Sequence, residues 1–199
     1  MKNSYLSICV AFSAAALPAH AELTDDRSLY ELAPKGSAYV RVVNTTSMSV
    51  TYDLADRTLI AEADCGVSPV TWIAPGKELE GNFTTEPGHL YTLTLSGDDR
   101  SWSVRKTETD SLRATLSLVN LSEAPVSLLT TEGARVVFPD VAPGSDVQRD
   151  LNPLTASLSI KLNSQVIPMT PVSLRRGQVT ETFVCGSADQ LRYSVVTRT

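Results

Sequence analysis

Apolar and polar residues alternate with a period of two along most of this chain, a pattern typical of strands that bury one face. Between residues 38 and 43, for example, Ala38, Val40 and Val42 share one face of an extended segment. The same alternation returns in further segments, at 50–54, 91–95, 102–104, 115–118, 126–128, 158–162, 182–185 and 191–195. Strands at this spacing, separated by turns, predict an all-β sandwich or barrel.

Turn residues between neighbouring segments predict how the first strands pair. A polar stretch at 44–47 separates 38–43 from 50–54. The run Gly97-Asp98-Asp99-Arg100 separates 91–95 from 102–104. Short polar or glycine-containing connections between two alternating segments are the usual signature of a hairpin. The sequence therefore predicts two hairpins before residue 106.

The second half of the chain repeats landmarks of the first in the same order. Val43-Asn44-Thr45-Thr46 resembles Val119-Asn120-Leu121-Ser122, and the pair Gly88 and Gly97 recurs with the same spacing as Gly177 and Gly186. Residues 106–111 between the repeats are polar and do not alternate. An ordered set of repeated landmarks indicates duplication. We therefore predict two tandem small β-sandwich domains, over residues 22–106 and 112–199.

The first 21 residues have the three parts of a secretory signal peptide. Met1-Lys2 supplies the positive charge, Leu6–Leu17 is apolar, and Ala19-His20-Ala21 is a small-x-small cleavage pattern. The apolar run is too short to span a bilayer permanently. We predict cleavage after Ala21 and export to the periplasm.

The charge of the chain argues against nucleic acid as a partner. Its 199 residues carry a formal net charge of −5, and repulsion opposes general binding to polyanions. A local basic patch is compatible with this balance.

Catalytic and metal-binding signatures are missing from the sequence. His89 is the only histidine after residue 21, and no G-x-S-x-G motif accompanies it. The run Gly144-Ser145-Asp146 follows Pro143 and is better explained as a turn than as an esterase block. No Cys or His cluster has metal-ligand spacing, and no glycine-rich loop precedes a helix. We therefore predict no catalytic residue, no metal and no cofactor.

Two cysteines remain after residue 21, Cys65 and Cys185, one in each predicted domain. An oxidising compartment permits a disulfide between them, which would link the two domains. Two separately buried thiols are the alternative, because sequence alone does not give the Cα spacing that a bridge requires.

The segment before the first strand and one tryptophan are candidates for partner binding. Leu29, Tyr30, Pro34 and Lys35 lie in an extended stretch that holds a Pro-Lys-Gly turn. Such a stretch can dock a partner, or it can be an edge segment that covers its own sheet. Trp72 anchors a partner if it faces solvent and belongs to the core if it does not.

Several of these runs carry a resemblance to a known family. The run Ala33-Pro34-Lys35-Gly36-Ser37, followed by Tyr39-Val40-Arg41-Val42-Val43-Asn44, resembles the alginate O-acetylation accessory protein family AlgF, as do Asn152-Pro153 and the run from Pro171 to Gly177. The resemblance covers nearly all of the chain after residue 21. It implies a periplasmic protein of two β-sandwich domains that acts beside a membrane-bound O-acyltransferase and SGNH-type periplasmic acetyltransferases. It supplies no catalytic residue.

From these observations we expect a non-catalytic periplasmic adaptor for O-acetylation of an exopolysaccharide, alginate in the first place and cellulose as the second polymer. Three alternatives stay open. A direct acetyl carrier or transferase requires a nucleophile such as Ser37, Ser145 or His89. A carbohydrate-binding module requires an exposed Trp72 or Trp102. A chaperone-like assembly module requires an open sheet edge that accepts a strand.

Overall fold

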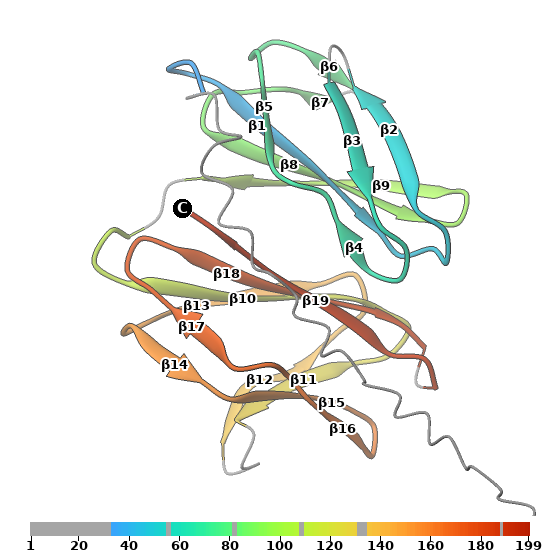
Figure 1. Ribbon diagram of the computed structural model, residues 1–199, viewed down its shortest axis with the longest axis vertical. Coiled ribbons are helices and arrows are strands. Elements are labelled where there is room, and N and C mark those ends of the chain that lie inside the picture. The colour runs from blue at the N-terminus through green and yellow to red at the C-terminus, as the bar shows by residue number, and fades with distance from the viewer. Residues whose placement is uncertain (1–32, 55–56, 81–82, 108–109, 131–134, 188) are drawn as a thin grey trace, which may run out of the picture. The chain divides into compact units, whose positions relative to one another are not determined.

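The computed structural model describes residues 33–54, 57–80, 83–107, 110–130, 135–187 and 189–199. The predicted signal peptide, Leu29 and Tyr30 lie outside the described residues. The described part contains strands and turns and no helix, so the predicted all-β fold is confirmed. Residues Ala33–Thr199 form one compact unit (Figure 1).

The described residues of the first half form nine strands in two layers. They are β1 (Ala38–Asn44), β2 (Val50–Leu54), β3 (Arg57–Ala61), β4 (Gly66–Val67), β5 (Thr71–Ile73), β6 (Glu78–Leu79), β7 (Phe83–Thr84), β8 (His89–Ser96) and β9 (Asp99–Lys106). In the main sheet, β1 pairs in parallel with β8 and antiparallel with β4 and β5, and β9 is the edge strand beyond β8. The β2–β3 and β6–β7 pairs cover one face of this sheet and enclose a core around Val40, Leu59 and Leu93.

One of the two predicted hairpins is confirmed and the other is wrong. β8 and β9 form the predicted hairpin across Gly97 and Asp98. β1 and β2, in contrast, belong to different layers, because β2 pairs with β3. Asn44 explains the crossing: its Nδ2 donates to Met48 O (2.7 Å) and Glu62 O (2.9 Å), and its Oδ1 accepts from Thr46 N (3.0 Å). These bonds turn the chain out of the main sheet.

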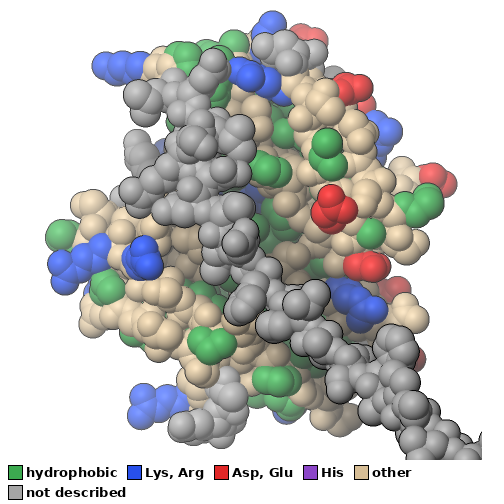
Figure 2. All heavy atoms as spheres, viewed as in Figure 1, with side chains coloured by type: hydrophobic (Ala, Val, Ile, Leu, Met, Phe, Trp, Pro, Cys, Tyr) green, Lys and Arg blue, Asp and Glu red, His purple; other side chains and the backbone are tan. Residues whose placement is uncertain are grey.

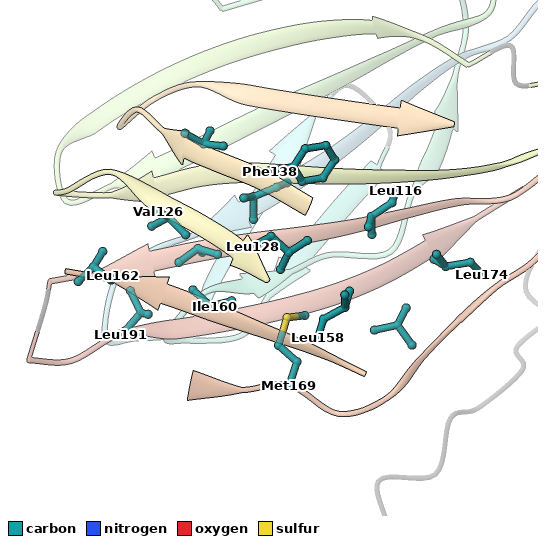
Figure 3. Close-up of a cluster of buried hydrophobic side chains, with 14 of the residues drawn as sticks. Leu116, Val126, Leu128, Phe138, Leu158, Ile160, Leu162, Met169, Leu174 and Leu191 are labelled. Atoms are coloured by element: carbon teal, nitrogen blue, oxygen red, sulfur yellow. The ribbon is translucent and has the colours of Figure 1, made fainter. Parts of the chain in front are cut away.

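Ten strands are formed by those residues of the second half that the structure describes. They are β10 (Ala114–Ser122), β11 (Val126–Thr130), β12 (Val136–Val141), β13 (Asp146–Leu151), β14 (Leu154–Ala156), β15 (Leu158–Leu162), β16 (Gln165–Pro168), β17 (Val172–Leu174), β18 (Val179–Gly186) and β19 (Arg192–Arg198). The main sheet has the order β13-β10-β18-β19, and a second sheet has the order β12-β11-β15-β16. Figure 3 shows the core between them, with side chains such as Leu116, Leu128 and Ile160 pointing toward one another.

The two halves share one topology, which supports the predicted duplication. β10 pairs in parallel with β18, as β1 does with β8, and β19 follows β18 as β9 follows β8. Asn120 repeats the role of Asn44: its Nδ2 donates to Ala124 O (2.9 Å) and Val141 O (2.8 Å), and its Oδ1 accepts from Ser122 N (2.9 Å). β9 ends at Lys106, the first residue of the predicted linker, and β10 begins at Ala114.

Both faces of β1 are buried. Ala38, Val40 and Val42 point into the core of the first half, whereas Arg41 and Val43 point the other way and are also inaccessible. β18 of the second half is buried on both faces as well. Strands that are buried on both faces indicate a second packing partner, and the second faces of β1 and β18 meet at the junction described next.

Candidate functional site

An apolar cluster joins the two halves where the outer faces of their main sheets meet. Val43 and Cys65 come from the first half, and Phe183 and Cys185 come from the second. Half-buried valines and leucines surround them: Val67, Val119, Leu121 and Val196. Burial of apolar surface stabilises this junction as it stabilises each core.

A disulfide between Cys65 and Cys185 crosses the junction, with a Cα–Cα distance of 5.6 Å. This distance lies within the usual range for such bonds. Both cysteines are inaccessible, at 0% and 2% exposure. Ser194 of β19 donates a hydrogen bond of 2.5 Å to the carbonyl oxygen of Cys65. The two halves are therefore linked covalently within a dry interface.

Cys65 adopts a backbone conformation that favours glycine, with φ of 76°. Its N–H donates to Asn44 O (3.0 Å), and the equivalent bond in the second half runs from Gly144 N to Asn120 O (2.8 Å). Gly144 has a φ of 71°. A cysteine therefore occupies a left-handed position that is filled by glycine in the other copy. A strained residue at a special position suggests a function for that residue, and here the function is the link to Cys185.

A buried ion pair lies beside the disulfide. Arg41 Nη1 is 2.5 Å from Glu181 Oε2, and Arg41 Nη2 is 3.0 Å from Glu181 Oε1. The side chains are 2% and 0% exposed. Arg41 Nε donates to Thr92 Oγ1 at 2.9 Å, and the guanidinium lies 4.8 Å from the centre of the Phe183 ring. This bidentate geometry is the strong form of an arginine–carboxylate contact.

Two further arginines contact the same carboxylate. Arg198 Nε lies 3.3 Å from Glu181 Oε2, and Arg105 Nη1 lies 3.3 Å from Oε1. Arg105 also donates to Ser117 Oγ (3.0 Å) and forms an ion pair with Asp146. Glu181 therefore lies at the centre of three guanidinium groups, of which Arg41 and Arg105 come from the first half and Arg198 from the second.

The arginines determine the ionisation of Glu181. Burial alone raises the pKa of its carboxyl group. The hydrogen bond with Arg41 and the charges of Arg41, Arg198 and Arg105 lower it, and together they outweigh burial. The net result is a pKa below the ordinary value of 4.5. Glu181 is therefore ionised in the folded protein at neutral pH and contributes the negative charge of this cluster.

The lowered pKa predicts a loss of stability in acid. A carboxyl group with a depressed folded-state pKa stabilises the fold at pH values above its unfolded-state pKa of about 4.3, and this contribution disappears as the pH falls through the folded-state value. We expect the free energy of unfolding of the wild type to approach that of Glu181→Gln below about pH 4. Urea denaturation of both proteins at a series of pH values measures this. If the difference in free energy of unfolding between the two proteins stays constant from pH 7 to pH 3, the prediction is wrong.

A pocket of about 470 Å³ opens beside this cluster. Its charged lining residues are Arg105, Lys106, Asp110, Asp146, Asp150 and Arg198. Asp146 is paired with Arg105, and Asp150 Oδ1 accepts a hydrogen bond of 2.6 Å from Thr115 Oγ1. Among the described residues that line it there is no histidine, cysteine or serine. The Thr115–Asp150 contact is a hydroxyl–carboxylate pair within the described lining, and no histidine of that lining accompanies it.

The structure places the candidate partner-binding residues near one end of the first sheet. Pro34 and Lys35 are exposed in a turn that Ser37 closes by donating its N–H (3.0 Å) and Oγ–H (2.7 Å) to Pro34 O. Trp72 lies opposite Tyr39 in the β1–β5 register, close to this turn. It is half-buried, and the guanidinium of Arg57 lies 4.3 Å from the centre of its ring. Leu29 and Tyr30 stay a prediction.

The candidate nucleophiles do not assemble into a catalytic arrangement in the described part of the chain. Ser37 Oγ donates to Pro34 O, and Nδ1 of His89 lies 3.0 Å from Pro87 O, which requires a proton on Nδ1. Ser145 is exposed in the turn before β13. No hydrogen bond among the described residues connects His89 to a serine.

The charged residues of the junction were missed by sequence reasoning. Arg41 was named only within the run that resembles the AlgF family, and Glu181, Arg105 and Arg198 were not singled out. A signal did exist, because Arg41 and Glu181 are each the one charged residue of the strand that holds them, and a buried charge requires a partner. What the sequence lacked was any indication that these two residues, which are 140 positions apart, meet.

Together, the fold and the junction define an all-β protein with two duplicated halves that are held by a disulfide and a buried arginine–glutamate cluster. A family model described as "Alginate O-acetyl transferase AlgF" matches residues 10–181. The chain belongs to the AlgF family.

Individual relatives agree with this assignment. The chain is 30% identical over 177 residues to "Alginate biosynthesis protein AlgF" of Azotobacter vinelandii, covering 83% of the chain and 81% of that protein. It is 29% identical over 195 residues to the protein of the same name from Pseudomonas aeruginosa PAO1, covering 94% and 89%. Among solved structures, the C-terminal domain of AlgF from P. aeruginosa matches 44% of the chain and 99% of its own length, with 34% identity and a TM-score of 0.40.

Proposed function

We propose that this protein is a non-catalytic periplasmic adaptor in the O-acetylation of an exopolysaccharide. Alginate is the first choice of polymer because the relatives are named alginate biosynthesis proteins, and cellulose is the alternative. The proposed partners are a membrane-bound O-acyltransferase and SGNH-type periplasmic acetyltransferases. In this proposal the partners make and break the acetyl bonds, and this chain holds them close together.

The observation that carries the proposal is the junction. Two buried interactions join the halves there, the Arg41–Glu181 ion pair and the Cys65–Cys185 disulfide. Buried groups that bond to each other are suited to holding two halves of a protein in a fixed orientation. Two partner sites on one rigid body raise the effective concentration of one partner near the other, and this raises the rate of transfer without new chemistry.

A direct acetyl carrier or transferase is the second candidate, since the family description contains the word transferase. It requires an acetyl ester or amide on a side chain of this protein. Ser37, Ser145 and His89 are the residues to test, and the first of them is nearly inaccessible, with its hydroxyl bonded to Pro34 O.

Two measurements test the adaptor. The tagged full chain, expressed in its own organism and crosslinked in cells, is expected to capture an O-acyltransferase or an SGNH-type acetyltransferase. In a strain that lacks the chromosomal gene, the triple variant Ser37→Ala, Ser145→Ala and His89→Gln is expected to restore polymer acetylation to the wild-type level. A melting curve confirms that the variant is folded.

Two results would overturn this proposal. The first is a folded triple variant that still captures its partners but fails to restore acetylation. The second is a covalent acetyl adduct that appears, by mass spectrometry, when the purified protein is incubated with an activated acetyl ester. Either result would favour the transferase.

A further inference from the structure

Two tight turns lie side by side at one end of the second half. In the first, which precedes β10, Arg113 N–H donates to Asp110 O (3.2 Å) and Leu112 N–H donates to Asp110 Oδ1 (2.8 Å). In the second, between β17 and β18, Gln178 N–H donates to Arg175 O (3.2 Å). A bond of 2.8 Å from Gly177 N to Arg113 O joins the turns (Figure 1, left side).

The tips of these turns bring together three arginines and one leucine. We call the group the basic tip, and it consists of Leu112, Arg113, Arg175 and Arg176. All four residues are exposed, and 73% of the Leu112 surface faces solvent. In Figure 2, Lys and Arg side chains lie beside hydrophobic ones at the left, where Figure 1 has these turns.

Within the part of the chain that the structure describes, ion pairs do not neutralise the charges of the basic tip. Among the described residues no ion pair involves Arg113, Arg175 or Arg176. The acid on the same turns is Asp110, whose Oδ1 already accepts the Leu112 N–H; Glu108 lies outside the described residues. The whole chain has a net charge of −5, so three arginines at one end that form no ion pair with a described residue would favour the approach of that end to an anionic surface.

We propose that the basic tip docks the protein on a membrane surface that contains anionic phospholipid. Arginines bind phosphate oxygens of lipid headgroups, and an exposed leucine among them enters the boundary between headgroups and acyl chains. Leu112 distinguishes this ligand from an acidic polymer, because a fully hydrated polyanion gives a lone exposed leucine nothing to pack against. The proposal rests on the proposed periplasmic location, and it would place the adaptor beside a membrane-bound partner.

Vesicle sedimentation tests the proposal with the purified chain that starts at Glu22. We expect the protein to sediment with vesicles that contain phosphatidylglycerol and to stay in solution with phosphatidylcholine vesicles. Arg175→Glu/Arg176→Glu is expected to weaken binding about tenfold or more, because two attractive charges become repulsive. Leu112→Ser is expected to weaken binding and to make the remaining binding more sensitive to salt.

The control variant is Lys77→Glu/Lys161→Glu, which changes the net charge by the same amount as Arg175→Glu/Arg176→Glu but at exposed lysines outside the two turns. The control is expected to bind phosphatidylglycerol vesicles more tightly than the Arg175→Glu/Arg176→Glu variant.

Three outcomes would overturn the membrane site: no binding of the wild type to phosphatidylglycerol vesicles, equal losses in the tip and control variants, or an unchanged Leu112→Ser variant. If the tip variant binds vesicles normally but fails to capture a protein partner in cells, the basic tip is a protein contact instead. Because vesicle binding requires neither partner proteins nor polymer, a failure here leaves the result of the acetylation test unaffected, and the two proposals can be judged separately.

Discussion

Replacing Glu181 by glutamine is expected to lower the free energy of unfolding by about 3–5 kcal/mol, the usual cost of removing one partner from a buried ion pair. The variant keeps the size of the side chain but removes the negative charge that Arg41, Arg105 and Arg198 share. Arg41 has no access to water in the fold, so its charge would remain buried without a counter-ion. Urea denaturation at pH 7, followed by circular dichroism, measures the loss.

Glu78→Gln is the matched control, because Glu78 is exposed and the same chemical change there is expected to alter stability by less than about 0.5 kcal/mol. Arg41 and Glu181 belong to different halves, so the stability that the ion pair contributes should be stability of the junction between them. A Glu181→Gln protein as stable as the Glu78→Gln protein would show that the cluster does not hold the junction.

Removing the disulfide is expected to cost about 2–5 kcal/mol. The bond joins positions 120 residues apart, so it constrains most of the unfolded chain, and large loops give the larger entropic effects. Cys65→Ala/Cys185→Ala is the preferred variant, because alanine introduces no hydroxyl group into the dry cluster around Phe183. Guanidinium denaturation under oxidising conditions gives the difference from the wild type.

Reductant provides the control for this second prediction. In the folded wild type the sulfurs are inaccessible, so we expect reductant alone to leave the bond intact and reductant with denaturant to break it. Under reducing conditions the unfolding curves of wild type and variant should then converge. If wild type and variant have the same unfolding curve without reductant, the disulfide contributes nothing to stability. The proposal that it holds the halves together would then be wrong.

Local patterns predicted nine of the described strands and the repeat of their landmarks, whereas others, such as β3, β12 and β13, were not predicted. Alternation in the run from Ala38 to Val43 correctly indicated a strand with Ala38, Val40 and Val42 on one face. The repeat of Asn44 as Asn120 corresponds in the structure to two amide side chains that make equivalent bonds. Such features depend on neighbours close in sequence, which is why periodicity reveals them.

Contacts between distant strands could not be predicted in this way. The parallel pairing of β1 with β8 joins residues about fifty positions apart, and the predicted hairpin of 38–43 with 50–54 failed because short-range turn signals do not specify which layer a strand joins. The junction is the extreme case, since Arg41 and Arg105 of the first half contact Glu181, which lies 140 and 76 positions further along the chain. A lone charge in an apolar strand shows that a partner exists but does not identify it.

The long separation of the two bonded cysteines has a consequence for how the protein is made. The N-terminal half of a chain is delivered first, so Cys65 must wait as a free thiol until β18 brings Cys185. Of the three cysteines in the sequence, the third is Cys9, within the predicted signal peptide. After cleavage each remaining thiol has one partner in the chain, so bond formation requires an oxidant but no reshuffling. A chain truncated before Cys185 would retain a reactive thiol at Cys65, a chemical mark of incomplete synthesis.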